Sequence, residues 1–231
     1  MYFFDPLYFI FLAPGLLLGL YAQWRVKRDF TRMRDVPVSS GMTGAEAAAH
    51  ILDRSGVPDC HVEETQGFLS DHYDPSSRTL RLSSDVYHGR SISALGVAAH
   101  EAGHALQHGK GYLPLKIRNG IVPLASVGSN LSFIVLMVGA MLAWGGLIWL
   151  GIALFSLTVV FQLVNLPVEF DASRRAKQEL LNQGLIDVTE QPLVSRVLTS
   201  AALTYVAATV TAILTLLYFL IRYAGVGRRD D

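Results

Sequence analysis

Two histidines and a glutamate lie close together in the run His100-Glu101-Ala102-Gly103-His104. In a helix, residues four apart differ by about 400° of rotation and one turn of rise, so both imidazoles lie on one face. Two imidazoles at this spacing bind one zinc ion, and the glutamate beside the first acts as general base on the water that the ion activates. The run therefore predicts a zinc hydrolase site, with Glu101 as the catalytic base and His100 and His104 as ligands.

The motif needs a helix to position it. We expect one from Ser91 or Ser93 to about His108, ended by Gly109 and Gly111. Small apolar residues around the motif would bury it: Ala94, Val97, Ala98, Ala99, Ala105 and Leu106.

A catalytic zinc site needs a third protein ligand. His108 is the nearest candidate, but on a straight helix it lies about 80° around and about 12 Å along from His100. Nor does it match the metzincin spacing. The better candidate is Glu169, the first charge after a long uncharged stretch, in a segment where Pro167 predicts the start of a helix. The alternative for Glu169 is an ordinary carboxylate at a helix N-terminus, favoured by the helix dipole.

The composition divides the chain into two kinds of segment. It has 231 residues, 19 basic and 19 acidic side chains, one cysteine and a mean hydropathy of +0.36. Three stretches have no charged residue: Pro6–Trp24, Asn119–Val168 and Val197–Ile221. The rest carries all the charge. This pattern excludes a simple cytosolic globule, a disordered chain and a disulfide-stapled module, and the absence of a basic excess argues against nucleic-acid binding.

The uncharged stretches predict four membrane spans, because one span needs about 20 apolar residues. The middle stretch has 50 residues, which fits two spans joined by a turn at Gly145-Gly146. The expected spans are about 6–24, 121–143, 147–166 and 198–221. Two spans between His104 and Glu169 return the chain to the same side of the membrane, so the three ligands can converge.

Charges around the first stretch predict its orientation. Basic residues follow the apolar run rather than precede it, which favours an uncleaved anchor over a signal peptide. They place the N-terminus outside and the next domain in the cytoplasm. These residues are Arg25, Lys27, Arg28, Arg32 and Arg34. A basic tail with Arg222, Arg228 and Arg229 argues for the opposite orientation of the last span, which stays open.

The remaining chain predicts a small α/β unit. A capping box from Thr43 to Glu46 opens a helix that reaches about Ser55. Strands are expected at His61–Thr65, Gly67–Tyr73 and Arg78–Ser83, the last two forming a hairpin. Five segments result: an anchor (1–24), a cytoplasmic part (25–118), a membrane hairpin (119–168), a cytoplasmic helix with the third ligand (169–196), and a final span with its tail (197–231).

The motifs also resemble a known group. His-Glu-x-x-His, a membrane hairpin and then Glu169-Phe-Asp-Ala172 are similar to the gluzincin membrane peptidases, which include the HtpX-type heat-shock protease and the CAAX prenyl protease. Ser70-Asp-His-Tyr-Asp-Pro75, Leu80-Arg-Leu-Ser83, Val97–His108 and Val168–Ser173 resemble the YugP-type neutral zinc metallopeptidases of bacteria. This resemblance covers most of the chain.

The resemblance implies zinc as cofactor, His100, His104 and Glu169 as ligands, and Glu101 as base. It implies an α+β zincin-like core, a minimal gluzincin, joined to about four transmembrane helices and mostly α overall. It also implies a site facing the cytoplasm in a bacterial inner membrane.

One position departs from the HtpX-type pattern, which has an acidic residue four positions after the glutamate ligand. Ser173 stands there, and Asp171 lies about 200° around the helix from the ligand. Candidates for orienting the ligands or stabilising an oxyanion are therefore several: Ser173, Asp171, Arg174, Tyr205, His72 and His88. In zincin-like folds a peptide pairs with a sheet edge. The expected edge strand comprises Arg78, Thr79, Leu80, Arg81, Leu82 and Ser83.

The expected function is a membrane endopeptidase that cleaves membrane or juxtamembrane protein substrates, with lipid as its surroundings and no nucleic-acid partner. Two rivals remain. In an intramembrane site-2-type protease the zinc helix is itself a span, but the apolar stretch Ala94–Leu106 is short and contains three ionisable groups. In a non-enzymatic zinc-binding scaffold Glu101 would have no use. The substrate, the cleavage preference and the oligomeric state are open.

Overall fold

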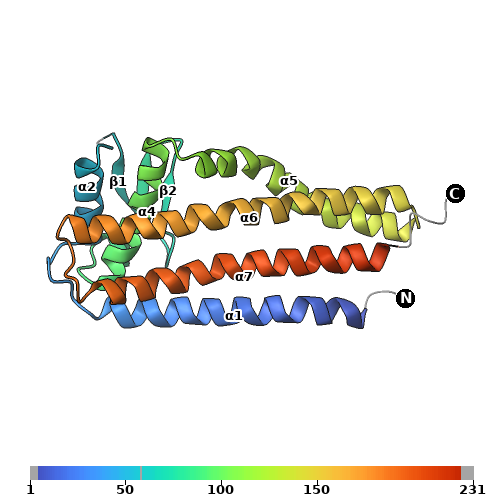
Figure 1. Cartoon of the computed structure of the whole chain (residues 1–231), viewed down its shortest axis with the longest axis horizontal. Helices are drawn as coiled ribbons and strands as arrows, with labels where there is room; N and C mark the ends of the chain where they lie inside the picture. The colour runs from blue at the N-terminus through green and yellow to red at the C-terminus, as the bar shows by residue number, and fades with distance from the viewer. Residues whose placement is uncertain (1–4, 58, 225–231) are drawn as a thin grey trace. The chain divides into compact units, whose positions relative to one another are not determined.

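The structure, a computed structural model, describes residues 5–57 and 59–224. The expected α+β core with a helical bundle is confirmed: the chain is mostly helical and has a small three-stranded sheet. The elements in chain order (Figure 1) are α1 (Pro6–Arg34), α2 (Gly44–Arg54), β1 (His61–Thr65), β2 (His72–Asp74), β3 (Thr79–Ser83), α3 (Ser84–Tyr87), α4 (Ile92–Gly109), α5 (Leu113–Met141), α6 (Gly145–Asn182) and α7 (Gln191–Tyr223).

The described residues form two compact units. The helical unit contains the chain up to Tyr21, the segment Ile117–Leu166 and the chain from Thr204 onward. The mixed unit contains Ala22–Lys116 and Pro167–Leu203, and so includes the sheet, α2, α3 and α4.

Four described helices, α1, α5, α6 and α7, are long and apolar enough to cross a membrane. Within the helical unit, glycines bring α5 and α6 close together: a Cβ on Gly151 would lie 2.6 Å from the Leu136 Cγ atom. Such contacts are typical of helix pairs in lipid. The turn between these helices lies at residues 142–144, with Ala143 at a φ of 51°. The expected turn at Gly145-Gly146 is thus wrong by a few residues, because those glycines begin α6.

The sheet of the mixed unit has the strand order β1-β3-β2. β3 pairs in parallel with β1 and antiparallel with β2, so the hairpin of β2 and β3 forms as expected. The prediction that Arg78–Ser83 is an edge strand is wrong: β3 occupies the centre and is hydrogen-bonded on both sides. β2 is also shorter than the predicted strand at Gly67–Tyr73.

An apolar core fills the mixed unit. Thr43 caps α2 with both hydrogen bonds of the predicted capping box, and Ser91 caps α4. Side chains from α2, the sheet, α4, α6 and α7 are buried together, among them Ile51, Leu82, Leu95, Leu106, Leu180 and Val194. The helix with the histidine motif is therefore held on several sides.

The segment that carries Glu169 is not a helix of its own. α6 runs unbroken through Pro167, and α7 begins at Gln191 after a loop. The prediction that Pro167 starts a helix is wrong, because proline removes only one backbone hydrogen bond from a long helix and leaves the turns on either side intact. Of the predicted basic tail, Arg228 and Arg229 lie outside the described residues.

Candidate metal centre

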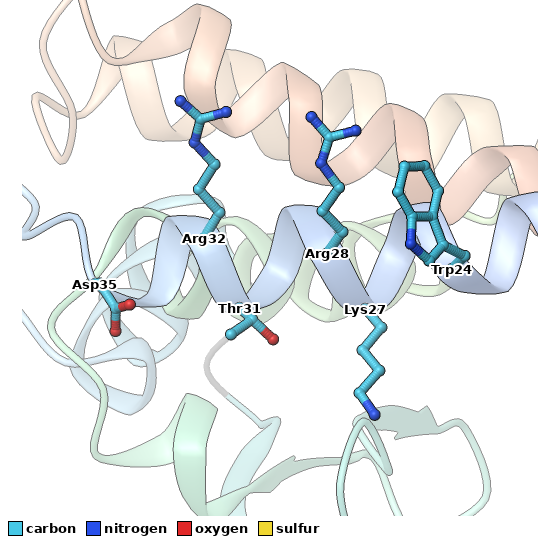
Figure 2. A pocket seen from close by; sticks show the side chains of 6 residues that line it. All are labelled: Trp24, Lys27, Arg28, Thr31, Arg32 and Asp35. Carbon is cyan, nitrogen blue, oxygen red and sulfur yellow. The ribbon is translucent and has the colours of Figure 1, made fainter.

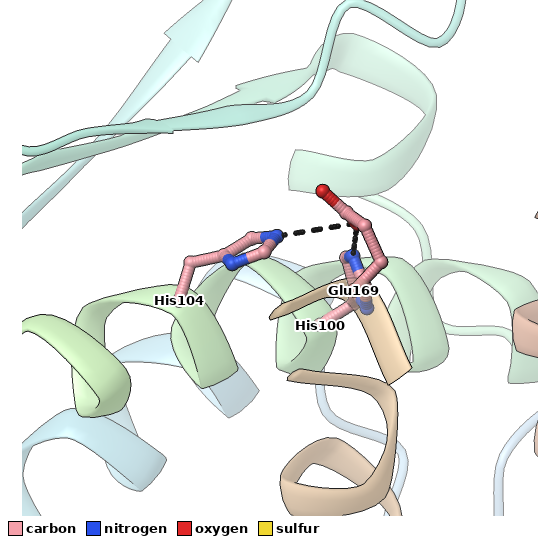
Figure 3. A group of neighbouring side chains, drawn as sticks. All are labelled: His100, His104 and Glu169. Atoms are coloured by element: carbon pink, nitrogen blue, oxygen red, sulfur yellow. Dashed lines mark ion pairs between the residues drawn. The ribbon is translucent and has the colours of Figure 1, made fainter. Parts of the chain in front are cut away.

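Three side chains from two helices converge in the mixed unit. His100 and His104 project from consecutive turns of α4, with ring centroids 4.8 Å apart. Glu169 comes from α6, and its Oε2 atom lies 3.3 Å from His100 Nε2 and 3.6 Å from His104 Nε2 (Figure 3). All three ligand atoms lie within 4.8 Å of one another. The structure thus brings together the three residues predicted as ligands.

A glycine permits this convergence. A Cβ on Gly103 would lie 2.7 Å from the carbonyl oxygen of Ala172 on α6. The backbones of α4 and α6 therefore approach more closely than any side chain at position 103 would allow. Glu169 lies one turn before Ala172, so this contact sets the distance from Glu169 to the histidines.

The three residues fit a zinc ion. Two ligands that bind one tetrahedral ion at about 2.1 Å lie about 3.4 Å from each other, close to the two nitrogen–oxygen distances above. Glu169 is buried, and its Oε2 atom has no hydrogen-bond partner among the described residues. Two imidazole nitrogens and a carboxylate oxygen directed at one point are a donor set that zinc binds.

Gln107 connects His104 to α6. This side chain is fully buried, and its Oε1 atom lies 3.0 Å from His104 Nδ1. Its Nε2 atom donates to the carbonyl oxygen of Val168 at 2.8 Å and to Asp171 Oδ2 at 3.0 Å.

The two acceptors fix the orientation of the Gln107 amide, because a flipped amide would place its oxygen against two other oxygens. Oε1 must then accept a hydrogen bond, so His104 carries its proton on Nδ1. The Nε2 lone pair of His104 is left facing Glu169. The amide thus selects the tautomer that a metal ligand needs.

Other candidate residues surround this network. Ser173 Oγ lies 3.1 Å from His100 Nδ1 and is placed to orient that ring. Asp171 does not touch a histidine but holds Gln107, as described above. Arg174 and Arg175 both bind Asp171, and Arg175 also lies over the Tyr112 ring.

Three histidine candidates and one tyrosine candidate are not part of this hydrogen-bond network. His108 Nδ1 lies 2.7 Å from the hydroxyl of Tyr73, so the His108 ring is hydrogen-bonded to a residue of β2. His72 is exposed on β2 with its Nδ1 atom against the carbonyl of Ser70, and His88 Nε2 faces Glu64. Tyr205 lies on α7 within the helical unit.

Glu101 is buried beside the ligands and makes no hydrogen bond or ion pair with another described residue. Its carboxylate is therefore open to a hydrogen bond from water or a ligand. Nearby, Asp71 accepts from the backbone N–H and the hydroxyl of Ser83. Burial raises the pKa of Asp71 despite these bonds, and the charge of Glu101 raises it further.

The charges of the centre favour a cation. Burial alone would lower the pKa of His104, but the carboxylates of Glu169 and Glu101 outweigh it and raise that pKa in the metal-free protein. The site therefore attracts positive charge, whether a proton or a metal ion.

Gln107 and Asp71 were not predicted from the sequence. Gln107 follows His104 by three residues and so shares its face, which is a usable signal. Asp71 has no such signal, because its approach to Glu101 depends on how the sheet packs on α4.

Two comparisons with known proteins found a match. Residues 8–224 match the model of a family described as "Putative neutral zinc metallopeptidase". The chain is 48% identical over 224 residues to the "Putative membrane protease YugP" of Bacillus subtilis (strain 168), covering 96% of this chain and 99% of that relative. No solved structure matches.

Proposed function

Because the chain belongs to the family described as "Putative neutral zinc metallopeptidase", we propose that it is a zinc-dependent endopeptidase of the membrane. The observation that carries the proposal is the convergence of His100, His104 and Glu169 beside a buried, unpaired Glu101.

Each residue has a distinct role in the proposed reaction. His100, His104 and Glu169 would hold Zn²⁺, with Ser173 and Gln107 fixing the two rings. When bound, the ion supplies a Lewis acid that polarises a peptide carbonyl and lowers the pKa of water. Glu101 takes a proton from the water that attacks the carbonyl carbon, then passes it to the leaving nitrogen as the C–N bond breaks. The products are a carboxylate and an amine.

The substrate would bind as an added strand along the sheet. β1 and β2 are the two edges, and β2 is the edge that packs against α4. The proposed substrate edge is therefore β2 rather than β3, because the sheet does not use the backbone groups on the outer side of β2. An extended peptide beside His72–Asp74 would lie near the helix that bears the histidines.

The proposed location is a bacterial inner membrane with the site on the cytoplasmic side. Support comes from the four long apolar helices and from the basic residues that follow the first uncharged stretch. α4 is not among those four helices, which weighs against a site-2-type enzyme whose zinc helix is a span. Membrane proteins and their juxtamembrane segments are then the proposed substrates.

The test uses purified full-length protein in detergent, with an unfolded membrane protein as reporter. Glu101→Gln preserves shape but cannot take a proton, so zinc content should stay near one per chain while cleavage falls at least about 100-fold. Glu64→Gln, which changes an exposed glutamate on β1, is the control and should cleave like wild type. Undiminished cleavage by Glu101→Gln would show that the proposed base is wrong.

A further inference from the structure

A shallow groove of about 430 Å³ lies along α1, just after the first uncharged stretch. Its lining comes from one helix: Trp24, Lys27, Arg28, Thr31, Arg32 and Asp35. Figure 2 shows Arg28 and Arg32 projecting to the same side from successive turns, with Trp24 one turn further along and Lys27 on the opposite side. The lining residues all belong to the mixed unit, and none of them is a residue of the metal centre.

The cations of this groove are not neutralised. Lys27, Arg28 and Arg32 make no ion pair with a described residue, whereas Arg25 and Arg34 each pair with a carboxylate. The Arg28 guanidinium lies 5.0 Å from the centroid of the Trp24 ring. Like charges four residues apart on a helix repel each other. One lining carboxylate, Asp35 at the far end, leaves a net positive charge for an anion to offset.

The groove continues an apolar face. Leu17, Leu20, Tyr21 and Trp24 are all about half exposed or more, and the last three lie three, four and seven residues after Leu17, which places all four on one face of α1. Arg28 extends the same row by one turn. A helix face that passes from leucine through tyrosine and tryptophan to arginine matches the order of acyl chain, interface and headgroup in a bilayer.

We infer that this groove binds the headgroup of an anionic phospholipid from the surrounding bilayer, an inference that rests on the proposed membrane location. Arg28 and Arg32 donate to the phosphate oxygens, because guanidinium groups match phosphate geometry. Trp24 packs at the glycerol level beside them. A zwitterionic headgroup binds more weakly, because its own cation meets the arginines.

The experiment measures Trp24 fluorescence of the full-length protein in lipid nanodiscs. The chain has three tryptophans, so Trp144→Phe and Trp149→Phe are introduced to isolate Trp24. Brominated phosphatidylglycerol or brominated phosphatidylcholine is added as quencher at equal amounts in a phosphatidylcholine bilayer. We expect the anionic lipid to quench at several-fold lower concentration.

The variant Arg28→Gln/Arg32→Gln should lose this preference, because each basic residue near an anionic surface is worth about fivefold in lipid affinity. Arg78→Gln/Lys110→Gln changes the net charge equally on exposed residues elsewhere and should keep it. Equal quenching by the two lipids, or an unchanged preference in the double variant, would overturn the inference. Loss of the preference on adding inorganic phosphate would also overturn it, by showing a free-anion site. None of these outcomes depends on hydrolysis, so failure of this inference would not count against the endopeptidase proposal.

Discussion

At the scale of single residues, Glu169 and His108 are the rival third ligands. Glu169 directs a buried oxygen at both histidines, while the His108 ring lies against the hydroxyl of Tyr73. Glu169→Ala should therefore leave two ligands and lose most bound zinc, whereas His108→Ala should retain it. Metal analysis of the two purified variants decides this. Zinc loss in His108→Ala alone would reverse the assignment.

Gln107 should matter without touching the metal. Its replacement in Gln107→Leu removes the acceptor that holds His104 in the required tautomer, and it removes one donor from Asp171 and from the Val168 carbonyl. Changes behind a ligand typically cost about 10- to 100-fold in metal affinity.

Competition with a chelator measures that affinity, and ¹⁵N NMR of the histidine rings reports the tautomer of His104 directly. Gln66→Leu, at an exposed glutamine, is the matched control. An unchanged affinity and tautomer in Gln107→Leu would remove the proposed role of this side chain.

The sequence predicted those residues whose roles follow from local spacing. His100 and His104 share a helical face by geometry alone. The role of Glu169 could be predicted because two spans between it and the motif return the chain to the same side of the membrane. Gln107 is different, because its donors find acceptors only once α6 packs on α4. Asp71 reaches Glu101 through folding of the sheet, which no local spacing encodes.

At the scale of elements, the contact of α4 with α6 depends on Gly103. Gly103→Ala inserts a methyl group 2.7 Å from the Ala172 carbonyl oxygen, so the helices must separate. We expect a loss of about 1–3 kcal/mol in the free energy of unfolding, together with weaker zinc binding.

Gly96 of the same helix offers the control. A Cβ there meets Val194 Cγ1 at 3.5 Å, an ordinary contact. Gly96→Ala should be neutral or stabilise the protein by up to about 1 kcal/mol, because alanine favours helix. Denaturant unfolding measures both variants. Equal stabilities for the two would contradict the close approach at Gly103.

Element types were predictable, but their neighbours were not. The alternation in Arg78–Ser83 identifies a strand, yet it does not say which strands lie beside it. β1 pairs with β3 although β2 separates them in the chain, and it covers the side of β3 that would have been an edge. Pro167 likewise indicated a helix start from local chemistry, whereas the turns on either side of it continue one helix.

At the scale of the whole molecule, the proposed topology predicts which loops face the cytoplasm. With the N-terminus outside, the turn at residues 142–144 lies outside and the loop between α6 and α7 lies inside. Cysteines can mark both positions, because Leu142 and Val188 are 65% and 72% exposed and the native Cys60 is buried.

A membrane-impermeant thiol reagent should label Leu142→Cys in cells whose inner membrane is intact, and Val188→Cys only after that membrane is opened. The Cys60→Ser background removes any native signal. The reverse labelling pattern would place the zinc ligands on the outer side and contradict the proposed substrates.

The most direct test of the metal centre is zinc X-ray absorption of the purified full-length protein. We predict two imidazole nitrogens and a carboxylate oxygen at about 2.0–2.2 Å from the metal, and loss of the oxygen contribution in Glu169→Ala. A sulfur ligand at about 2.3 Å, or a wild-type spectrum that Glu169→Ala leaves unchanged, would contradict a centre built from His100, His104 and Glu169.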